Sequence, residues 1–114
     1  MKVLCALNRR AADGMGMRWW PEVSALLRAF GLDYHLLADG ESPLDRQLSD
    51  HLRAMGPGEY GAIAGIGGDG THSLLLNALM TLRRTVPDFS LPPYAFIPMG
   101  TGNDIAKSLG ILTR

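Results

Sequence analysis

At its centre the chain runs Ala62-Ile63-Ala64-Gly65-Ile66 and then Gly67-Gly68-Asp69-Gly70-Thr71. The first five residues form a short apolar run that predicts a buried strand, and the apolar spacing after them predicts a helix over residues 71–84. Small residues at a strand–loop–helix junction let backbone N–H groups turn toward a phosphate, and the helix adds its positive N-terminus. The junction therefore predicts an anion site.

A second junction of the same kind follows about thirty residues later. Tyr94-Ala95-Phe96-Ile97 leads through Pro98 and Met99 into Gly100-Thr101-Gly102-Asn103-Asp104, and a helix is expected from Asn103 to Leu109. Two junctions in one small domain predict two loops that converge on one polyphosphate. A single loop of this type has an equally good explanation as a tight turn, with Thr71 as the cap of the helix.

Neither loop has the sequence of a standard phosphate motif. No Gly-Lys-Ser/Thr end is present, and the third glycine of the dinucleotide fingerprint is missing after Gly70. A carboxylate such as that of Asp69 repels a phosphate unless a divalent cation or a hydroxyl proton lies between them, which points to a nucleotide with Mg²⁺. Gly68 and Gly100 are expected to be required for close backbone approach and positive φ.

Strands and helices are expected to alternate along the whole chain. The predicted strands are Lys2–Leu7, Asp33–Leu37, Ala62–Ile66 and Tyr94–Pro98. This order predicts an α/β fold, a Rossmann-like parallel sheet with helices on both faces. Ligands of such sheets bind beyond the carboxyl ends of the strands, where both junctions and Asn8 fall.

Several local features carry expectations of their own. Residues 8–17 are expected to form a loop, Pro21 to stand in the first turn of the next helix, and Ser42 to cap the helix after that. Cys5 is expected to be a small buried hydrophobe. The apolar faces of these two helices are predicted to hold Trp19, Trp20, Val23, Leu26, Leu27 and Phe30 in the first, and Leu44, Leu48, Leu52 and Met55 in the second.

Composition narrows the class of protein. The chain has 114 residues, enough for one domain, and a formal net charge of +0, which gives no sign of nucleic-acid binding. No apolar run reaches the ~20 residues of a membrane span, and no signal peptide is visible, so a cytoplasmic location is expected. The three histidines lack metal-ligand spacing, which argues against zinc.

The two junctions together resemble the catalytic domain of diacylglycerol kinases, especially the bacterial lipid kinases related to sphingosine kinases. The resemblance spans essentially the whole chain; the first motif is shared with NAD kinases, and the second favours the lipid kinases. It implies that residues 1–114 form the N-terminal ATP-binding lobe of an enzyme that transfers the γ-phosphate of ATP to a lipid hydroxyl, such as that of diacylglycerol or a sphingoid base. It also implies ATP and Mg²⁺ as cofactors, and a β-rich C-terminal domain, absent from this chain, that holds the lipid and the general base.

The resemblance assigns a catalytic role to Asp69. The residues expected to bind the cofactor are Asn8, Gly67, Gly68, Asp69, Gly70, Thr71, Gly100, Thr101 and Asn103. Two positions depart from the family pattern: Arg9 follows Asn8 where the family usually has proline, and Leu74 stands where it usually has glutamate. Arg9 and Arg10 are candidates to neutralise phosphate, although loop arginines are mostly solvated.

The departures keep two alternatives open, an NAD kinase-like enzyme and a catalytically degenerate, nucleotide-binding regulatory module. The expected partners are a nucleotide and, through the missing domain, a lipid acceptor. Transient contact with a membrane surface and a homodimer also stay open.

Overall fold

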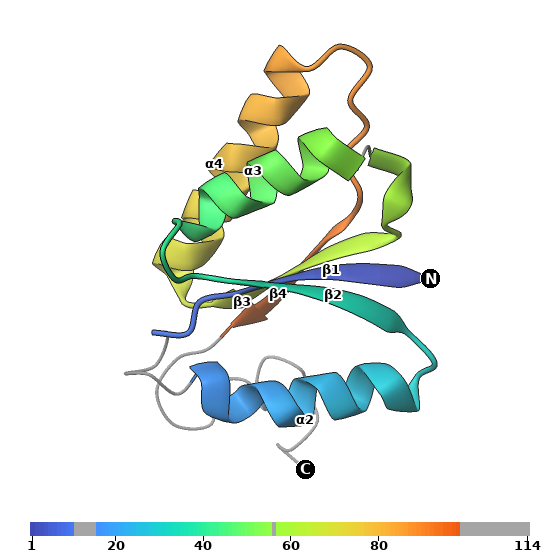
Figure 1. The fold of residues 1–114 in the computed structure, drawn as a ribbon, viewed down its shortest axis with the longest axis vertical. Coiled ribbons are helices and arrows are strands. Elements are labelled where there is room, and N and C mark those ends of the chain that lie inside the picture. Colours follow the sequence, from blue (N-terminus) through green and yellow to red (C-terminus); the bar gives the residue numbers. More distant parts are fainter. Residues whose placement is uncertain (11–15, 56, 99–114) are drawn as a thin grey trace.

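The computed structural model describes residues 1–10, 16–55 and 57–98. The elements follow the predicted alternation of strand and helix (Figure 1). In chain order they are β1 Lys2–Leu7, α2 Gly16–Ala29, β2 Asp33–Ala38, α3 Leu44–Met55, the 3-10 turn η1 Pro57–Glu59, β3 Ala62–Gly67, α4 Asp69–Thr85 and β4 Tyr94–Pro98.

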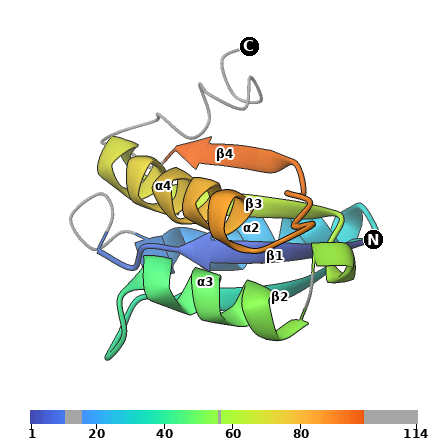
Figure 2. The ribbon, with the colours of Figure 1, turned by 90° about the horizontal axis from the view of Figure 1, so that it is seen from above.

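The four strands form one parallel sheet in the order β2-β1-β3-β4. Helices α3 and α4 lie on one face and α2 on the other, as Figures 1 and 2 show. The predicted α/β class with helices on both faces is confirmed. From β1 the chain first adds β2 on one side and later β3 on the other, so the strand order reverses between β1 and β3. Such a reversal opens a crevice at the carboxyl ends of the two strands, where ligands of open α/β sheets bind.

Strand β1 has apolar contacts on both of its faces. Leu4 and Ala6 face the core under α3 and α4, whereas Val3, Cys5 and Leu7 face the core under α2. A strand covered on both sides needs a continuous apolar sequence, which is why this run does not alternate with polar residues. Cys5 is fully buried as predicted, and its burial raises the pKa of the thiol to about 12.

The start of α2 differs from the prediction. The helix begins at Gly16, so Met17 belongs to it and Pro21 lies inside the helix rather than in its first turn. Proline removes one backbone N–H donor there, and the Ser24 hydroxyl donates to the Pro21 carbonyl at 3.1 Å. Two residues of the predicted apolar face are not buried, since Leu26 is 44% and Phe30 is 77% exposed.

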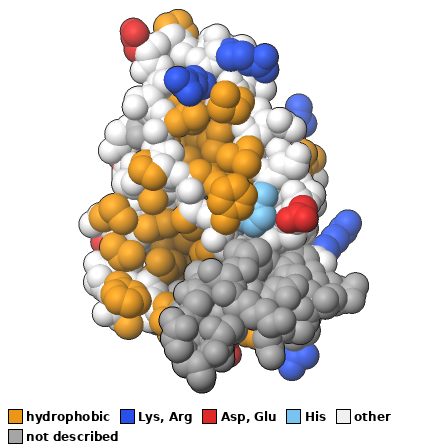
Figure 3. All heavy atoms as spheres, turned by 180° about the vertical axis from the view of Figure 1, so that it is seen from behind, with side chains coloured by type: hydrophobic (Ala, Val, Ile, Leu, Met, Phe, Trp, Pro, Cys, Tyr) orange, Lys and Arg blue, Asp and Glu red, His pale blue; other side chains and the backbone are white. Residues whose placement is uncertain are grey.

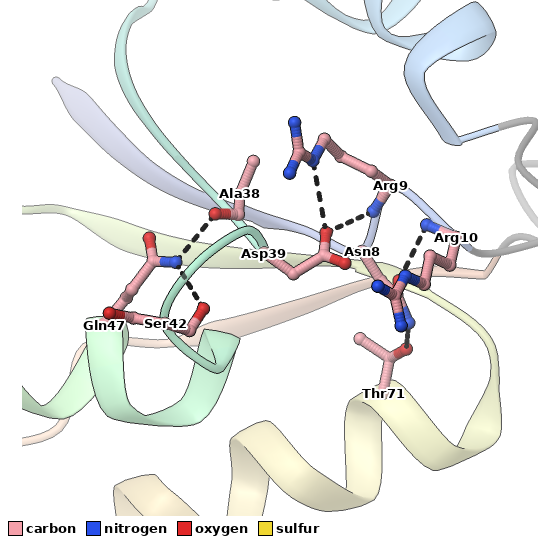
Figure 4. Close-up of polar contacts among 8 residues, drawn as sticks. All are labelled: Asn8, Arg9, Arg10, Ala38, Asp39, Ser42, Gln47 and Thr71. Atoms are coloured by element: carbon pink, nitrogen blue, oxygen red, sulfur yellow. Dashed lines mark hydrogen bonds and ion pairs between the residues drawn. The ribbon is translucent and has the colours of Figure 1, made fainter.

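Helix α3 also begins differently from the prediction. It starts at Leu44, so Pro43 rather than Ser42 occupies the cap position, and the Pro43 carbonyl accepts the Gln47 N–H at 3.1 Å. The Gln47 side chain donates to the carbonyls of Ala38 at 2.8 Å and Ser42 at 2.9 Å (Figure 4). A side chain one turn into the helix therefore ties α3 to the end of β2. The predicted apolar face is buried except for Met55, which is 46% exposed at the helix end.

One face of the molecule carries a broad group of hydrophobic side chains (Figure 3). Among the exposed large hydrophobic residues are Phe96 of β4, at 56%, and Met80 of α4, at 47%. β4 is the last strand of the described sheet and has one neighbour, β3. The helix predicted at residues 103–109 lies outside the described residues. Within the described ranges, no helix has the length and apolar character needed to cross a membrane.

Candidate functional site

The carboxyl ends of β1 and β3 bring two predicted site residues into direct contact. Asn8 follows β1, and its backbone N–H donates to the Ile66 carbonyl of β3 at 2.9 Å. Its side-chain Nδ2 donates to Oγ1 of Thr71 at 2.7 Å, across 63 residues of sequence (Figure 4). The contact lies where the strand order reverses, which is the position at which open α/β sheets bind their ligands.

The first turn of α4 presents its backbone amides at the same edge. The first bond of the helix runs from the His72 N–H to the Gly68 carbonyl at 3.1 Å, so the amides of Asp69, Gly70 and Thr71 precede it. Gly68 is the N-cap residue and supplies no side-chain cap. Amides in this position, together with the positive end of the helix dipole, favour an anion.

Thr71 and Asp69 have different helical positions from those predicted. The helix was expected to begin at Thr71, but it begins at Asp69, so Thr71 is its third residue and does not cap it. The Thr71 side chain is buried and turned toward β1, which frees it from capping and places it against Asn8. Asp69 is exposed in the first turn, where a carboxylate is stabilised by the helix dipole.

The three glycines of the junction differ in why they are glycine. A Cβ on Gly67 would lie 2.6 Å from Cβ and Oγ1 of Thr71, so this position needs the missing side chain for close approach. A Cβ on Gly70 would meet nothing within 4 Å. Gly68 has φ −85° and ψ −172°, an extended conformation open to any residue, so the expectation of positive φ there was wrong. Among the described glycines only Gly31 has positive φ.

Asp39, directly after β2, is a residue of this edge that the sequence analysis did not select. Its Oδ1 accepts the Arg9 backbone N–H at 2.6 Å and lies 3.7 Å from Arg9 Nε (Figure 4). Arg9, a candidate to neutralise phosphate, is therefore paired with an acid, and its side chain is 46% exposed. An acid two residues after the end of a predicted strand was the available signal. The Arg10 backbone N–H donates to Oδ1 of Asn8 at 2.9 Å, which fixes the amide of Asn8.

The second junction lies outside the described residues. Gly100, Thr101, Asn103 and Asp104 therefore stay predictions. The strand that leads to them is described, and Pro98 of β4 is paired in register with Gly67 of β3. The chain thus leaves β4 at the same edge of the sheet as Asn8 and the start of α4.

Within the described ranges no group of three or more His, Cys, Asp or Glu side chains could hold a metal ion. Asp69 is the acid at the start of α4. Mg²⁺ is commonly held by one or two carboxylates together with phosphate oxygens, so a single acid beside a phosphate site fits a nucleotide-bound Mg²⁺. It does not fit a metal held by the protein alone.

Comparison with known proteins gives a consistent result. The sequence model described as "Diacylglycerol kinase catalytic domain" matches residues 2–114. Proteins named "Probable lipid kinase YegS" from Salmonella arizonae and Salmonella newport are each 35% identical to this chain over 108 residues, which is 95% of the chain. A solved structure entitled "A putative diacylglycerol kinase from Bacillus anthracis str. Sterne" superposes with a TM-score of 0.65 at 30% identity over 96% of the chain.

The matched region is a minor part of each relative. The chain spans 33% of the length of the two Salmonella proteins and 36% of the Bacillus anthracis chain.

Proposed function

The chain belongs to the diacylglycerol kinase catalytic domain family, and on this premise we propose that it is the nucleotide-binding lobe of a lipid kinase. The enzyme would transfer the γ-phosphate of ATP to a lipid hydroxyl, such as that of diacylglycerol or a sphingoid base. The observation that carries the proposal is the hydrogen bond between Asn8 and Thr71 at the strand-order reversal, beside the open amides of α4. The family match favours this enzyme over the NAD kinase-like alternative.

The hydrogen bond determines what Thr71 can do. A hydroxyl has one proton to donate and two lone pairs. Since Oγ1 of Thr71 accepts from Nδ2 of Asn8, its own proton remains available for a phosphate oxygen. Arg10 holds the Asn8 amide in the orientation that makes Nδ2 the donor. Asn8 is thus the residue that orients Thr71, and Thr71 with the amides of Asp69 and Gly70 binds the phosphate chain.

Asp69 would hold the Mg²⁺ that accompanies the nucleotide. Its exposed carboxylate stands in the first turn of α4, where a bare phosphate would be repelled by it. The ion would neutralise charge that develops on the phosphates during transfer, which is the main catalytic requirement of phosphoryl transfer. Gly67 and Gly68 bring the backbone close to the phosphates, and Gly100, Thr101 and Asn103 would complete the site from the second junction.

The acceptor lipid needs more protein than this lobe supplies. Transfer in preference to hydrolysis requires a closed site that excludes water, and the relatives are about three times as long as this chain. We assign the lipid pocket and the general base to a β-rich C-terminal domain beyond residue 114. Transient membrane contact during lipid capture, a homodimer and a cytoplasmic location stay parts of this proposal.

The residue at position 74 favours a second candidate function, one without catalysis. Leu74, where the family usually has glutamate, is 43% exposed on α4 and lines a surface groove with Asp45 and Asn77. A leucine cannot replace a carboxylate in catalysis. The second candidate is therefore a regulatory module that binds nucleotide without transferring phosphate.

Nucleotide binding is tested by calorimetry of the 114-residue chain with Mg·ATP. Thr71→Val keeps the branched shape and removes the hydroxyl, and we expect about a tenfold loss of affinity, the size of a lost hydrogen bond to a charged group. Asn8→Asp is expected to weaken binding further, because the new acceptor takes the Thr71 proton and adds charge. Thr81→Val is the matched control, since Thr81 lies on the same helix and its exposed hydroxyl bonds only within that helix, to the Asn77 carbonyl and to Arg84. A wild-type chain that does not bind Mg·ATP would refute the proposal.

Phosphate transfer separates the two candidates. The chain alone should bind Mg·ATP and phosphorylate neither diacylglycerol, nor a sphingoid base, nor NAD. The protein extended beyond residue 114 should phosphorylate one of the lipids. Binding without transfer by the extended protein would favour the regulatory module, and robust transfer by residues 1–114 would overturn the assignment of the acceptor site to a further domain.

A further inference from the structure

His72 is a buried polar residue that the proposed phosphate site does not use. It follows Thr71 in the first turn of α4, and only 5% of its surface is exposed. Its Nδ1 lies 2.8 Å from the hydroxyl of Tyr94, the first residue of β4. The ring also packs against Phe96, with 4.8 Å between the ring centroids. The start of α4 is therefore joined to β4 by a hydrogen bond and by aromatic contact.

Gly65 of β3 provides the space for this pair. A Cβ on Gly65 would clash with the Tyr94 hydroxyl and would lie 3.1 Å from Nδ1 of His72. The glycine has no other role visible in the described structure, because it lies inside a strand and its φ is not positive. The three positions form one arrangement that connects α4, β3 and β4.

The hydrogen bond is compatible with a neutral ring that carries its proton on Nε2. Burial raises the pKa of Tyr94 to about 12, so its hydroxyl keeps its proton. With this hydroxyl as the donor to Nδ1, the neutral imidazole carries its own proton on Nε2, which is the tautomer assigned here. Nε2 is buried and makes no hydrogen bond in the described structure. The imidazole lies beside backbone groups of Gly67 and Ile97, near the ends of β3 and β4.

We propose that His72 is a positioning residue, which fixes the first turn of α4 against β4 and so places the amides at the start of that helix for the nucleotide. This inference rests on the proposed nucleotide site. Through Tyr94 the ring is fixed to β4, and through its own backbone it is fixed to the first turn of α4. His72 itself does not touch the phosphates, because its Nε2 is shielded from solvent.

The role gives nucleotide binding a dependence on pH. Burial lowers the pKa of His72 from its ordinary value of 6.5, against the opposing effects of the Gly67 and Ile97 backbone and of Asp69. The titratable groups that face the ring are Asp69 from α4 and Tyr94 from β4, and β3 has no titratable side chain. Above pH 6.5 the ring is neutral and competent. Protonation is shifted below pH 6.5 by the lowered pKa; it would place a charge in an apolar site and turn Nδ1 into a donor, so affinity should fall as the pH drops through that lowered pKa.

Calorimetry with Mg·ATP at pH 7.5 and pH 5.5 tests the inference. His72→Gln places an amide near the Nε2 position and should stay within about threefold of wild type, whereas His72→Leu should lose about tenfold at pH 7.5. The leucine variant should also lose the part of the pH dependence that His72 causes, and its melting temperature should fall slightly, because the Tyr94 hydroxyl loses its partner. The matched control is His51→Leu, which breaks a His–Tyr pair far from the nucleotide and should leave the affinity unchanged.

The possible results distinguish a failure of the proposed function from a failure of the positioning role of His72. A wild-type chain that binds no Mg·ATP would overturn the proposed function and this inference together. Wild-type binding with unchanged affinity in His72→Leu would overturn only the positioning role and leave His72 as a packing residue. If the leucine variant does not fold, Tyr94→Phe replaces it. That variant removes the hydroxyl that bonds Nδ1 of His72 and should lose about threefold in affinity. An unchanged affinity would overturn the positioning role.

Discussion

Two histidines that pack on the sheet are each paired with a tyrosine: His51 at the amino end, and His72 in the first turn of α4 at the carboxyl end. The two pairs differ in whether a buried ring nitrogen lacks a hydrogen-bond partner. At the amino end, Nε2 of His51 lies 2.6 Å from the Tyr60 hydroxyl, and the ring stacks on His35 with 4.6 Å between centroids. Lys2 covers the Tyr60 ring at 5.8 Å. At the carboxyl end, His72 has a partner at Nδ1 but none at Nε2 in the described structure.

The groups around the two histidine–tyrosine pairs also differ in whether they have partners. At the amino end the His51–Tyr60 bond, the stacked histidines and the Lys2–Tyr60 contact join these side chains to one another, so they contribute to stability. At the carboxyl end, no residue of the described ranges bonds the first amides of α4 or takes the Thr71 proton, and Asp69 is exposed. Groups that a fold leaves without partners cost stability, and they are tolerated where a ligand provides the partner. Mutations at the carboxyl end should therefore change binding, and mutations at the amino end should change stability alone.

The largest effect is expected at Gly67, where one substitution at the carboxyl end should change stability as well as nucleotide binding. Gly67→Ala places a Cβ 2.6 Å from Thr71, so we expect a loss of about 3 kcal/mol in unfolding free energy together with weaker nucleotide binding. Thermal and urea denaturation measure the first effect. Gly70→Ala is the control, since its Cβ would meet nothing within 4 Å. If Gly67→Ala melts like wild type, Thr71 can move aside and the close approach is not required.

Asp69→Asn should sharpen the contrast, because it changes binding and not stability. We expect about a tenfold loss of affinity for Mg·ATP, from the lost charge beside the ion, and a change in unfolding free energy of about 0.5 kcal/mol from the helix dipole. Calorimetry with and without Mg²⁺ measures the effect. Asp45→Asn, the first-turn acid of α3, controls for the dipole. Equal affinity in the Asp69 variant and wild type would reduce Asp69 to a turn residue.

Tyr60→Phe is the corresponding test at the amino end. It removes the hydroxyl from Nε2 of His51 in a buried position and should cost about 1 kcal/mol in unfolding free energy, with the affinity for Mg·ATP unchanged. Tyr34→Phe is the control, because the Tyr34 hydroxyl has a long, exposed contact of 3.4 Å with Arg28 and should matter less. Altered nucleotide binding in Tyr60→Phe would show that the two ends are coupled.

The smallest effect is expected from the titration of His51. Burial and then the charges of His35 and Lys2 lower its pKa, against the opposing charge of Glu59. A histidine with a lowered pKa in the folded state takes up its proton more readily when unfolded, so stability should be complete above pH 6.5 and fall as the pH drops below it. His35→Gln removes one of the charges that lower the pKa of His51 and should make this fall shallower. Urea denaturation between pH 5 and 8 measures both slopes, and equal slopes would exclude coupling between the two histidines.

The sequence by itself determined the elements and the edge of the sheet where the site lies. Strands β1 and β4 have the predicted bounds, and β2 and β3 extend one residue further than predicted. These features follow from apolar runs and from glycine, proline and aspartate at their ends, which act over a few residues. Parallel strands with alternating helices then place every junction at the carboxyl edge. The residues that end up at this edge could therefore be named from local signals.

Only the tertiary structure decided which of these residues touch. The bond between Asn8 and Thr71 spans 63 positions, and the pairing of Arg9 with Asp39 spans 30. Both depend on the strand order β2-β1-β3-β4, which local periodicity does not encode. The start of α4 at Asp69 and the burial of His72 against Tyr94 depend on the same order, because β4 lies beside β3 and Gly65 leaves room between them. Local chemistry sets what each residue can donate or accept, and the packing of distant strands sets which partner it meets.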